Sequence, residues 1–223
     1  MGTMIINNRK VEFNGEKNVL EVVRKAGIDL PTFCYHSELS LYGACRMCIV
    51  EDDRGKIFAS CSQIPKDGMV IFTHTQKLRR YRKLILELLL SNHDRDCTSC
   101  NITGKCDLRK LAHRFNIDDI RFEQLNNNMA IDISSHSIVR NPNKCIYCGD
   151  CVRVCEEVQG VGALSFTHRG SNMRISPDFN KQISETNCVG CGQCRTVCPT
   201  GAITVKDDRE EFWEAIDDKN KRV

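Results

Sequence analysis

Four groups of cysteines divide this chain, and their spacing is typical of thiols that bind metal. The chain has 223 residues, of which 15 are cysteine. The stretch 188–199 reads Cys-x2-Cys-x2-Cys-x3-Cys-Pro, and 145–155 repeats the same four-cysteine spacing. Such a tight loop predicts that its first three thiolates bind a [4Fe–4S] cluster and that its fourth thiolate reaches a neighbouring cluster. The repeat therefore predicts two adjacent clusters that exchange their last ligands.

This exchange predicts which thiols share a cluster. The first repeat and the last thiol of the second give one [4Fe–4S] set, namely Cys145, Cys148, Cys151 and Cys198. The remaining thiols give the other [4Fe–4S] set, namely Cys188, Cys191, Cys194 and Cys155. Two zinc sites are the alternative, but zinc motifs usually use two separate Cys-x2-Cys pairs. Unbroken runs of four cysteines favour iron, and neighbouring clusters suit electron transfer between them.

The N-terminal cysteines form a looser group. They are a first thiol, a close pair and a distant fourth thiol, namely Cys34, Cys45, Cys48 and Cys61. This order predicts a [2Fe–2S] cluster, although the plant-type spacing begins with Cys-x4-Cys. Zinc is the serious alternative for this group, because a loop, a close pair and a last cysteine also suit a zinc site.

The residues before Cys34 favour iron at this site. Two short strands, 4–6 and 10–13, are joined at Asn7–Asn8, a pair that tolerates the positive φ of a tight hairpin turn. A helix should follow, with Asn18 as its N-cap and Glu21 completing a capping box. A hairpin, a helix and then cysteine-bearing loops is the order of a β-grasp, plant-ferredoxin-like domain.

The third group is short of one ligand. It has three cysteines, namely Cys97, Cys100 and Cys106. His93 precedes Cys97 by four residues, and imidazole is a legitimate fourth ligand of iron, one that raises the potential relative to thiolate. His93 is therefore the predicted fourth ligand of a third [4Fe–4S] cluster. His113 and a three-cysteine site with an open iron are the alternatives.

These groups predict an α+β fold in four parts. The parts are a β-grasp [2Fe–2S] domain at 1–75, a small helical domain at 76–139 whose [4Fe–4S] ligands are one histidine and three cysteines, a bacterial-ferredoxin-like domain with two [4Fe–4S] clusters at 140–206, and a helical tail at 207–223. An amphipathic helix is expected at 76–92, with an apolar face of Leu78, Tyr81, Leu84, Ile85, Leu88 and Leu89. Its basic residues are expected on a solvated face, namely Lys77, Arg79, Arg80, Arg82 and Lys83.

The rest of the composition excludes several classes of protein. The N-terminus has no apolar secretory signal, and the most apolar stretch, Leu84–Leu90, carries Glu87 and is too short to span a bilayer. We therefore expect a cytoplasmic protein without membrane insertion, whose thiols bind metal instead of forming disulfides. The formal charge of +3 counts every thiol as neutral. Ligation would bring it to about −4, so the basic balance does not indicate nucleic acid.

The order of the motifs resembles a known family. YGACRMC, HDRDCTSC, KCIYCGDCVRVCEEVQGVGAL and CVGCGQCRTVCPTGAI carry the resemblance, which covers almost the whole chain. The chain is similar to the N-terminal half of the large subunit of NADH-linked [FeFe] hydrogenases. It also resembles this region of NAD-dependent formate dehydrogenases and of the large peripheral iron–sulfur subunit of respiratory complex I. The second four-cysteine motif favours the hydrogenase and formate dehydrogenase branch, because the complex I subunit generally keeps one.

The resemblance implies a multi-cluster electron-transfer subunit. Electrons would pass between a flavoprotein that oxidises NAD(P)H and a further redox or catalytic subunit: ferredoxin, a hydrogenase, a formate dehydrogenase or a transhydrogenase module. A cytoplasmic hetero-oligomer is implied, with electron bifurcation as one option. No catalytic constellation and no Gly-x-Gly-x-x-Gly phosphate loop is present in the sequence. The alternatives are the N-terminal part of a catalytic [FeFe] hydrogenase, whose catalytic domain would lie beyond Val223, and a complex I-type NADH dehydrogenase subunit.

Overall fold

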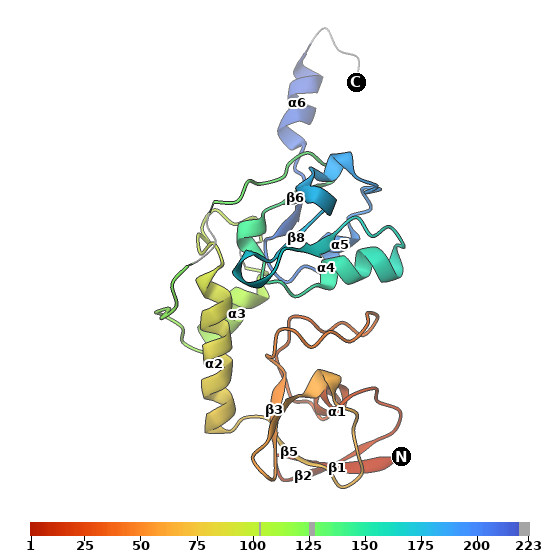
Figure 1. The fold of residues 1–223 in the computed structure, drawn as a ribbon, viewed down its shortest axis with the longest axis vertical. Helices are drawn as coiled ribbons and strands as arrows, with labels where there is room; N and C mark the ends of the chain where they lie inside the picture. The colour runs from red at the N-terminus through yellow and green to blue at the C-terminus, as the bar shows by residue number, and fades with distance from the viewer. Residues whose placement is uncertain (103, 125–127, 219–223) are drawn as a thin grey trace.

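The N-terminal part of the chain is a five-stranded sheet with one helix. The computed structural model describes residues 1–102, 104–124 and 128–218. The N-terminal elements are β1 (Gly2–Ile6), β2 (Arg9–Phe13), α1 (Val19–Lys25), β3 (Ile49–Asp52), β4 (Ile57–Ala59) and β5 (Val70–Phe72). The strand order is β2-β1-β5-β3-β4, in which β1 and β5 are parallel and the other neighbours antiparallel. This is the predicted β-grasp arrangement, and it lies at one end of the molecule (Figure 1).

The turn and helix signals that favoured this fold are present in the structure. Asn7–Asn8 has φ values of 51° and 64°, as a tight hairpin turn requires. Asn18 caps α1, because its side chain accepts a hydrogen bond from the Glu21 amide at 3.1 Å. The other half of the predicted capping box differs. The Glu21 carboxylate accepts from the Lys17 amide and the Tyr35 hydroxyl, both at 2.6 Å. The helix is thereby tied to the residue after the first cysteine.

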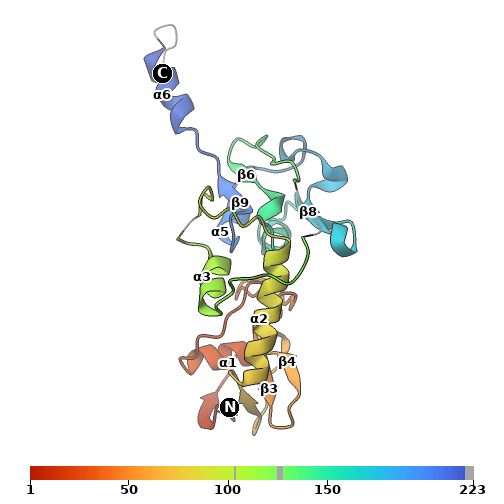
Figure 2. The ribbon, with the colours of Figure 1, turned by 90° about the vertical axis from the view of Figure 1, so that its left-hand side faces the viewer.

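Helix α2 (Gln76–Ser91) runs from the sheet toward the C-terminal part of the molecule, and α3 (Asp107–Arg114) packs against it (Figures 1 and 2). The predicted faces of α2 need correction. Tyr81 and Leu88, expected in the apolar face, are 41% and 47% exposed. Arg82, expected on the solvated face, is only 4% exposed. Arg82 lies four residues from both Leu78 and Leu86, so the helical period places it on their buried face.

The C-terminal part holds two small sheets and two short helices. Its elements are β6 (Ile138–Arg140), α4 (Asp150–Arg153), β7 (Ser165–Thr167), β8 (Arg174–Ser176), α5 (Gln193–Thr196) and β9 (Ile203–Val205). Strand β6 pairs with β9, and β7 with β8, both antiparallel. The first and last strands of this part therefore pair with each other and close it around a core that includes Ile138, Leu164 and Ile203. The whole fold is α+β, as predicted.

Several short turns complete the chain. The 3₁₀ turns are Ser60–Ser62, Pro142–Lys144, Gly170–Asn172, Asp178–Asn180 and Ile183–Glu185, and α4 continues into a π-helical turn at Val154–Val158. The tail forms α6 (Arg209–Asp217), which projects away from the other elements (Figures 1 and 2). The predicted tail extends to 223, but 219–223 lies outside the described residues. None of the helices in the described part of the chain has the length and apolarity of a membrane span.

Candidate metal centres

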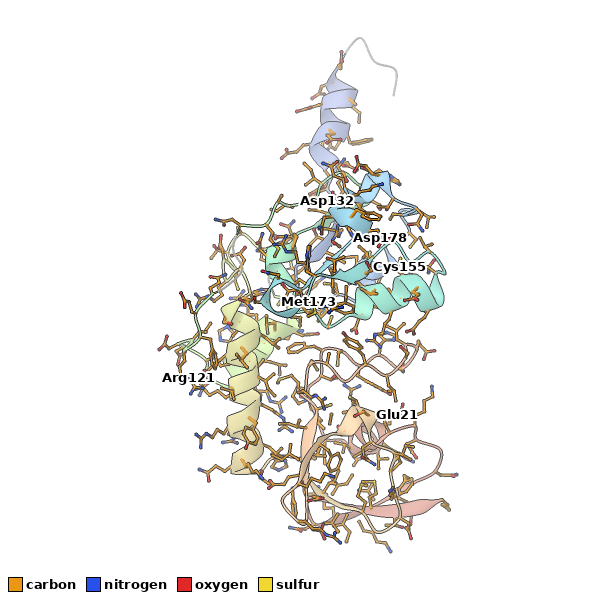
Figure 3. The ribbon with its side chains drawn as sticks, viewed as in Figure 1. Glu21, Arg121, Asp132, Cys155, Met173 and Asp178 are labelled. Atoms are coloured by element: carbon orange, nitrogen blue, oxygen red, sulfur yellow. The ribbon has the colours of Figure 1, made fainter. Side chains whose placement is uncertain are left out.

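Two cavities in the C-terminal part are each lined by four thiols. The cavity that we call the inner thiol site is lined by Cys145, Cys148, Cys151 and Cys198. The cavity that we call the outer thiol site is lined by Cys155, Cys188, Cys191 and Cys194. Each cavity thus takes three thiols from one sequence repeat and the fourth from the other. Figure 3 shows Cys155 on the helical segment that continues from α4.

The repeated sequence explains why the two cavities are alike. Gly149 and Gly192 precede α4 and α5, and both have left-handed backbones, with φ of 79° and 73°. Each glycine directly follows the second cysteine of its repeat, so the chain turns sharply there and the third cysteine enters a helix. A Cβ atom on Gly149 would also lie 2.9 Å from the ring of Phe166. The turn thus allows three thiols of one loop to line one cavity.

The inner and outer thiol sites differ in how strongly burial raises the pKa values of their thiols. Burial raises the pKa of Cys145 to about 12 and places the pKa values of Cys148 and Cys151 well above the ordinary thiol value. At the outer site, burial raises the pKa of Cys194 to about 11, and Cys191 is exposed. Neutral thiols must lose protons before they can bind metal. Deprotonation therefore costs more at the inner site, where water is largely excluded.

The N-terminal thiol site comprises four buried cysteines, namely Cys34, Cys45, Cys48 and Cys61. The Sγ atoms of Cys34 and Cys45 lie 3.3 Å apart. The hydrogen bond between these two thiols raises the pKa of Cys34 and lowers that of Cys45, and a bond between Cys48 and Cys61 has the same paired effect. The Phe33 amide also donates to Cys45 Sγ at 3.4 Å. Such amide bonds favour the thiolate form that ligates iron.

The fourth site, which we call the His93 site, is that of the third cysteine group and contains the predicted histidine. His93, Cys97 and Cys106 line one cavity. His93 is 6% exposed, and its Nδ1 atom is buried without a hydrogen-bond partner. Burial, followed by the nearby charge of Lys144, lowers the pKa of His93 to about 4, so the ring is neutral at neutral pH. A neutral ring with an unpartnered nitrogen fits the donor that a metal site requires. His113 lines the same cavity but is exposed.

The fourth site lies close to the inner thiol site. The second cysteine of its group, Cys100, is adjacent to Gly201, because a Cβ atom on Gly201 would lie 2.8 Å from the Cys100 Sγ atom. The Asp107 amide donates to the Pro199 carbonyl at 3.3 Å. Pro199 directly follows Cys198 of the inner thiol site. Segments that are distant in the sequence therefore bring these two sites together.

A buried arginine joins the inner thiol site to the N-terminal thiol site. Arg153, on α4, donates to the backbone carbonyl of Cys34 at 2.8 Å and to that of Ser40. It also forms an ion pair with Asp150, and its guanidinium lies 5.5 Å from the ring centre of Tyr42. Sequence reasoning missed this contact. The available signal was an arginine between two predicted ligand cysteines, in Cys-Val-Arg-Val-Cys.

The donor atoms fit iron clusters in kind and number. Eight cysteines line the inner and outer sites, and the four N-terminal cysteines lie close enough to act on one another's charge. His93, Cys97 and Cys106 line the fourth cavity; Cys100 is not among its lining residues, but its charge acts on Cys106. Within residues 1–102, 104–124 and 128–218, no three His, Cys, Asp or Glu side chains converge closely enough for one metal ion. A cluster instead distributes its ligands over several iron atoms.

Three family models match consecutive parts of the chain. Residues 3–76 match a 2Fe-2S iron–sulfur cluster binding domain. Residues 82–121 match the NADH-ubiquinone oxidoreductase-G iron–sulfur binding region, and residues 136–202 match a 4Fe-4S dicluster domain. The predicted types of cluster, [2Fe–2S] and [4Fe–4S], agree with these matches.

Whole proteins match as well. The chain is 35% identical to the NADP-reducing hydrogenase subunit HndD of Solidesulfovibrio fructosivorans, over 97% of this chain and 38% of that protein. It is 35% identical to the NADH-ubiquinone oxidoreductase 75 kDa subunit of Reclinomonas americana, over 92% of this chain and 30% of that subunit. The chain thus spans less than two fifths of these curated relatives. A crystal structure of an NAD+-reducing [NiFe]-hydrogenase superposes with a TM-score of 0.85 and 30% identity, covering 92% of this chain and 87% of that one.

Proposed function

The chain belongs to the family formed by the iron–sulfur region of NADH-ubiquinone oxidoreductase G and 75 kDa subunits and the corresponding subunits of NAD-reducing hydrogenases, and from this premise we propose that it conducts electrons through four clusters. It is an iron–sulfur electron-transfer chain of NADH-linked oxidoreductases. The observation that carries the four-cluster proposal is the exchange of Cys155 and Cys198 between two cavities. The four predicted parts, 1–75, 76–139, 140–206 and 207–223, are the proposed units.

The proposed ligands follow the four sites. The N-terminal thiol site holds a [2Fe–2S] cluster, and the inner and outer thiol sites each hold a [4Fe–4S] cluster. His93, through its buried Nδ1 atom, joins Cys97, Cys100 and Cys106 around the third [4Fe–4S] cluster. The clusters supply one-electron redox chemistry. The side chains hold thiolates in place, exclude water and set the potentials through burial and hydrogen bonds.

The proposed partners are a flavoprotein that oxidises NAD(P)H and a second redox or catalytic subunit. Members of this family are subunits of multi-subunit complexes, so the chain is part of a hetero-oligomer. A cytoplasmic location and ferredoxin as a further partner are part of the same proposal. The isolated chain should bind no flavin and oxidise no NADH, because its sequence lacks a phosphate-binding glycine loop. Tight flavin binding by the isolated chain would contradict this division of labour.

Metal analysis of anaerobically purified protein tests the cluster proposal. We expect about fourteen iron atoms per chain, together with matching acid-labile sulfide, from one two-iron and three four-iron clusters. EPR of the reduced protein should show both cluster types. Stoichiometric zinc with little iron would overturn the proposal.

A second candidate is that these residues are the front part of a catalytic chain, as in an [FeFe] hydrogenase. The observation that favours it is the length of the curated relatives, of which this chain covers 38% or less in the two cases above. Purification of the native complex, followed by mass spectrometry of its subunits, distinguishes the two candidates. A relay subunit would be accompanied by separate flavoprotein and catalytic chains, whereas a single longer chain that evolves hydrogen would support the second candidate.

A further inference from the structure

The buried arginine of α2 holds the backbone on both sides of a cluster cysteine. Arg82 is 4% exposed. Its Nε atom donates to the Met47 carbonyl at 3.1 Å, its Nη2 atom to the Ile49 carbonyl, and its Nη1 atom to the Thr73 carbonyl at 2.8 Å. Met47 and Ile49 are the residues immediately before and after Cys48. One guanidinium therefore binds the backbone carbonyls of both residues that flank Cys48.

The charge of this guanidinium needs a counter-charge. Its three hydrogen-bond partners are neutral carbonyls, and none of the ion pairs within the described residues includes Arg82. Burial lowers the pKa of Arg82 to about 10, and the negative charge of Cys48 acts in the opposite direction. The group is thus a cation at neutral pH. An unpaired buried charge is strongly destabilising, and Cys48, whose negative charge acts on Arg82, belongs to the N-terminal thiol site.

We propose that Arg82 is the positioning residue and the fixed counter-charge of the N-terminal cluster. This inference rests on the proposed [2Fe–2S] assignment. The guanidinium holds the Cys48 loop in place, and its positive charge favours the form of the cluster that carries one more electron. In that step one ferric iron accepts one electron from a reductant and becomes ferrous. No proton or bond changes at Arg82, so the midpoint potential is raised without any coupled chemistry.

The other cations of α2 provide the natural contrast. Lys77, Arg79, Arg80 and Lys83 are exposed on the same helix. Water and salt screen exposed charges strongly, whereas buried charges are screened much less. Arg79, three residues before Arg82, is therefore a matched control: the same side chain on the same helix, without burial.

The experiment compares Arg82→Gln, Arg82→Lys and Arg79→Gln with the wild-type protein. Iron content and the EPR signal of the reduced [2Fe–2S] cluster are measured first, because a wild-type protein without this signal refutes the cluster assignment and not the role of Arg82. Midpoint potentials then follow from EPR-monitored redox titration with dithionite at low and high salt. Arg82→Gln should shift the [2Fe–2S] potential to more negative values at both salt concentrations. Arg82→Lys, which keeps the charge, and Arg79→Gln should stay near wild type at high salt.

Each outcome decides the inference. A wild-type potential in an Arg82→Gln protein that contains the cluster overturns it, and so does an Arg82→Lys potential as negative as that of Arg82→Gln. If Arg82→Gln assembles no cluster, Arg82→Lys decides: a retained potential supports the counter-charge, and a lowered one overturns it. If both Arg82 variants lose only the [2Fe–2S] cluster while Arg79→Gln keeps all four, the positioning role is supported.

Discussion

The inner and outer thiol sites have the same ligand pattern but differ in their surroundings. Cys148 and Cys151 of the inner site are each 7% exposed, whereas Cys191 of the outer site is exposed. The inner site lies between the C-terminal core and the N-terminal part, which Arg153 connects. The outer site contacts the same core through Cys188 and Cys194, which are only partly buried. The repeated motif therefore places four thiols around each cavity, while the packing around the cavity decides how far its thiols are shielded from water.

Removal of one ligand from each site should give the largest difference. We expect Cys151→Ala and Cys191→Ala each to lower the iron content from about fourteen to about ten atoms per chain. Cys151→Ala should also lower the melting temperature far more, because Cys151 is part of the apolar core of the C-terminal part and metal binding there is folding free energy. Iron analysis and thermal denaturation measure both effects. Equal melting temperatures would show that burial does not separate the two sites.

The ion pair at the inner site allows a matched comparison of charge. Arg153 and Asp150 are paired three residues apart, with side chains 8% and 6% exposed. Lys110 and Asp107 are also paired three residues apart, but their side chains are 61% and 57% exposed. Arg153→Met should lower the free energy of unfolding by about 3 kcal/mol, because it leaves a buried carboxylate without its partner. Lys110→Met should cost less than about 1 kcal/mol.

Denaturant unfolding of both variants measures this difference. Arg153→Met should also weaken the contact between the N-terminal and C-terminal parts, since it loses the bonds to the Cys34 and Ser40 carbonyls. Limited proteolysis between these parts should then become faster. A loss of stability in Arg153→Met no larger than that in Lys110→Met would contradict the comparison.

The sequence was sufficient to predict which thiols line the inner and outer sites, but not what surrounds them. Cysteine spacing predicted the exchange of Cys155 and Cys198, because a tight loop cannot direct its fourth thiol into its own cavity. Counting ligands predicted His93, and its burial is what the structure adds. The first prediction depends on the spacing of neighbouring cysteines, and the second on a count of ligands. Both features can be read directly from a sequence.

Arg82 and Arg153 could not be predicted in the same way. Arg82 was assigned to the solvated face because arginine is usually exposed, yet its partners are carbonyls 9 to 35 residues away in the sequence. Arg153 contacts carbonyls more than 100 residues away. Backbone carbonyls are present at every residue, so no residue type marks them as the partners of a buried cation. Only the packing of α2 and α4 against the N-terminal loops reveals them.

Solvent access should also determine the order in which iron is lost. The Cys151→Ala and Cys191→Ala proteins each keep one of the paired sites. Both also keep the N-terminal site and the His93 site, so a difference in iron release between the two proteins can be assigned to the paired site that each retains. We expect the outer site, kept in Cys151→Ala, to lose iron to an anaerobic chelator several-fold faster than the inner site, kept in Cys191→Ala. The absorbance of the iron–chelator complex over time measures the rates. Equal rates, or faster release from the inner site, would remove the protective role assigned to burial.

The smallest expected effect concerns the site of His93. There burial lowers the pKa of a base, whereas at the inner and outer thiol sites it raises the pKa of acids. Burial lowers the pKa of His93 to about 4, from an ordinary value of 6.5. Between about pH 6.5 and pH 4, His93 is therefore protonated in the unfolded chain but neutral in the folded chain. The free energy of unfolding falls as the pH falls through this window. The buried thiols of the inner site have pKa values far above this window. Between about pH 7 and pH 5.5, His93 should account for a loss of about 1 kcal/mol.

Denaturation at about pH 7 and pH 5.5 tests this sign in three proteins. His93→Gln should lose less stability on acidification than the wild type, since glutamine has no proton to bind. His36→Gln, which removes an exposed histidine, should keep the wild-type dependence. If His93→Gln and wild type change equally with pH, the folded and unfolded chains protonate His93 alike. The ring would then be accessible to water, and its place as a buried, neutral ligand would be lost.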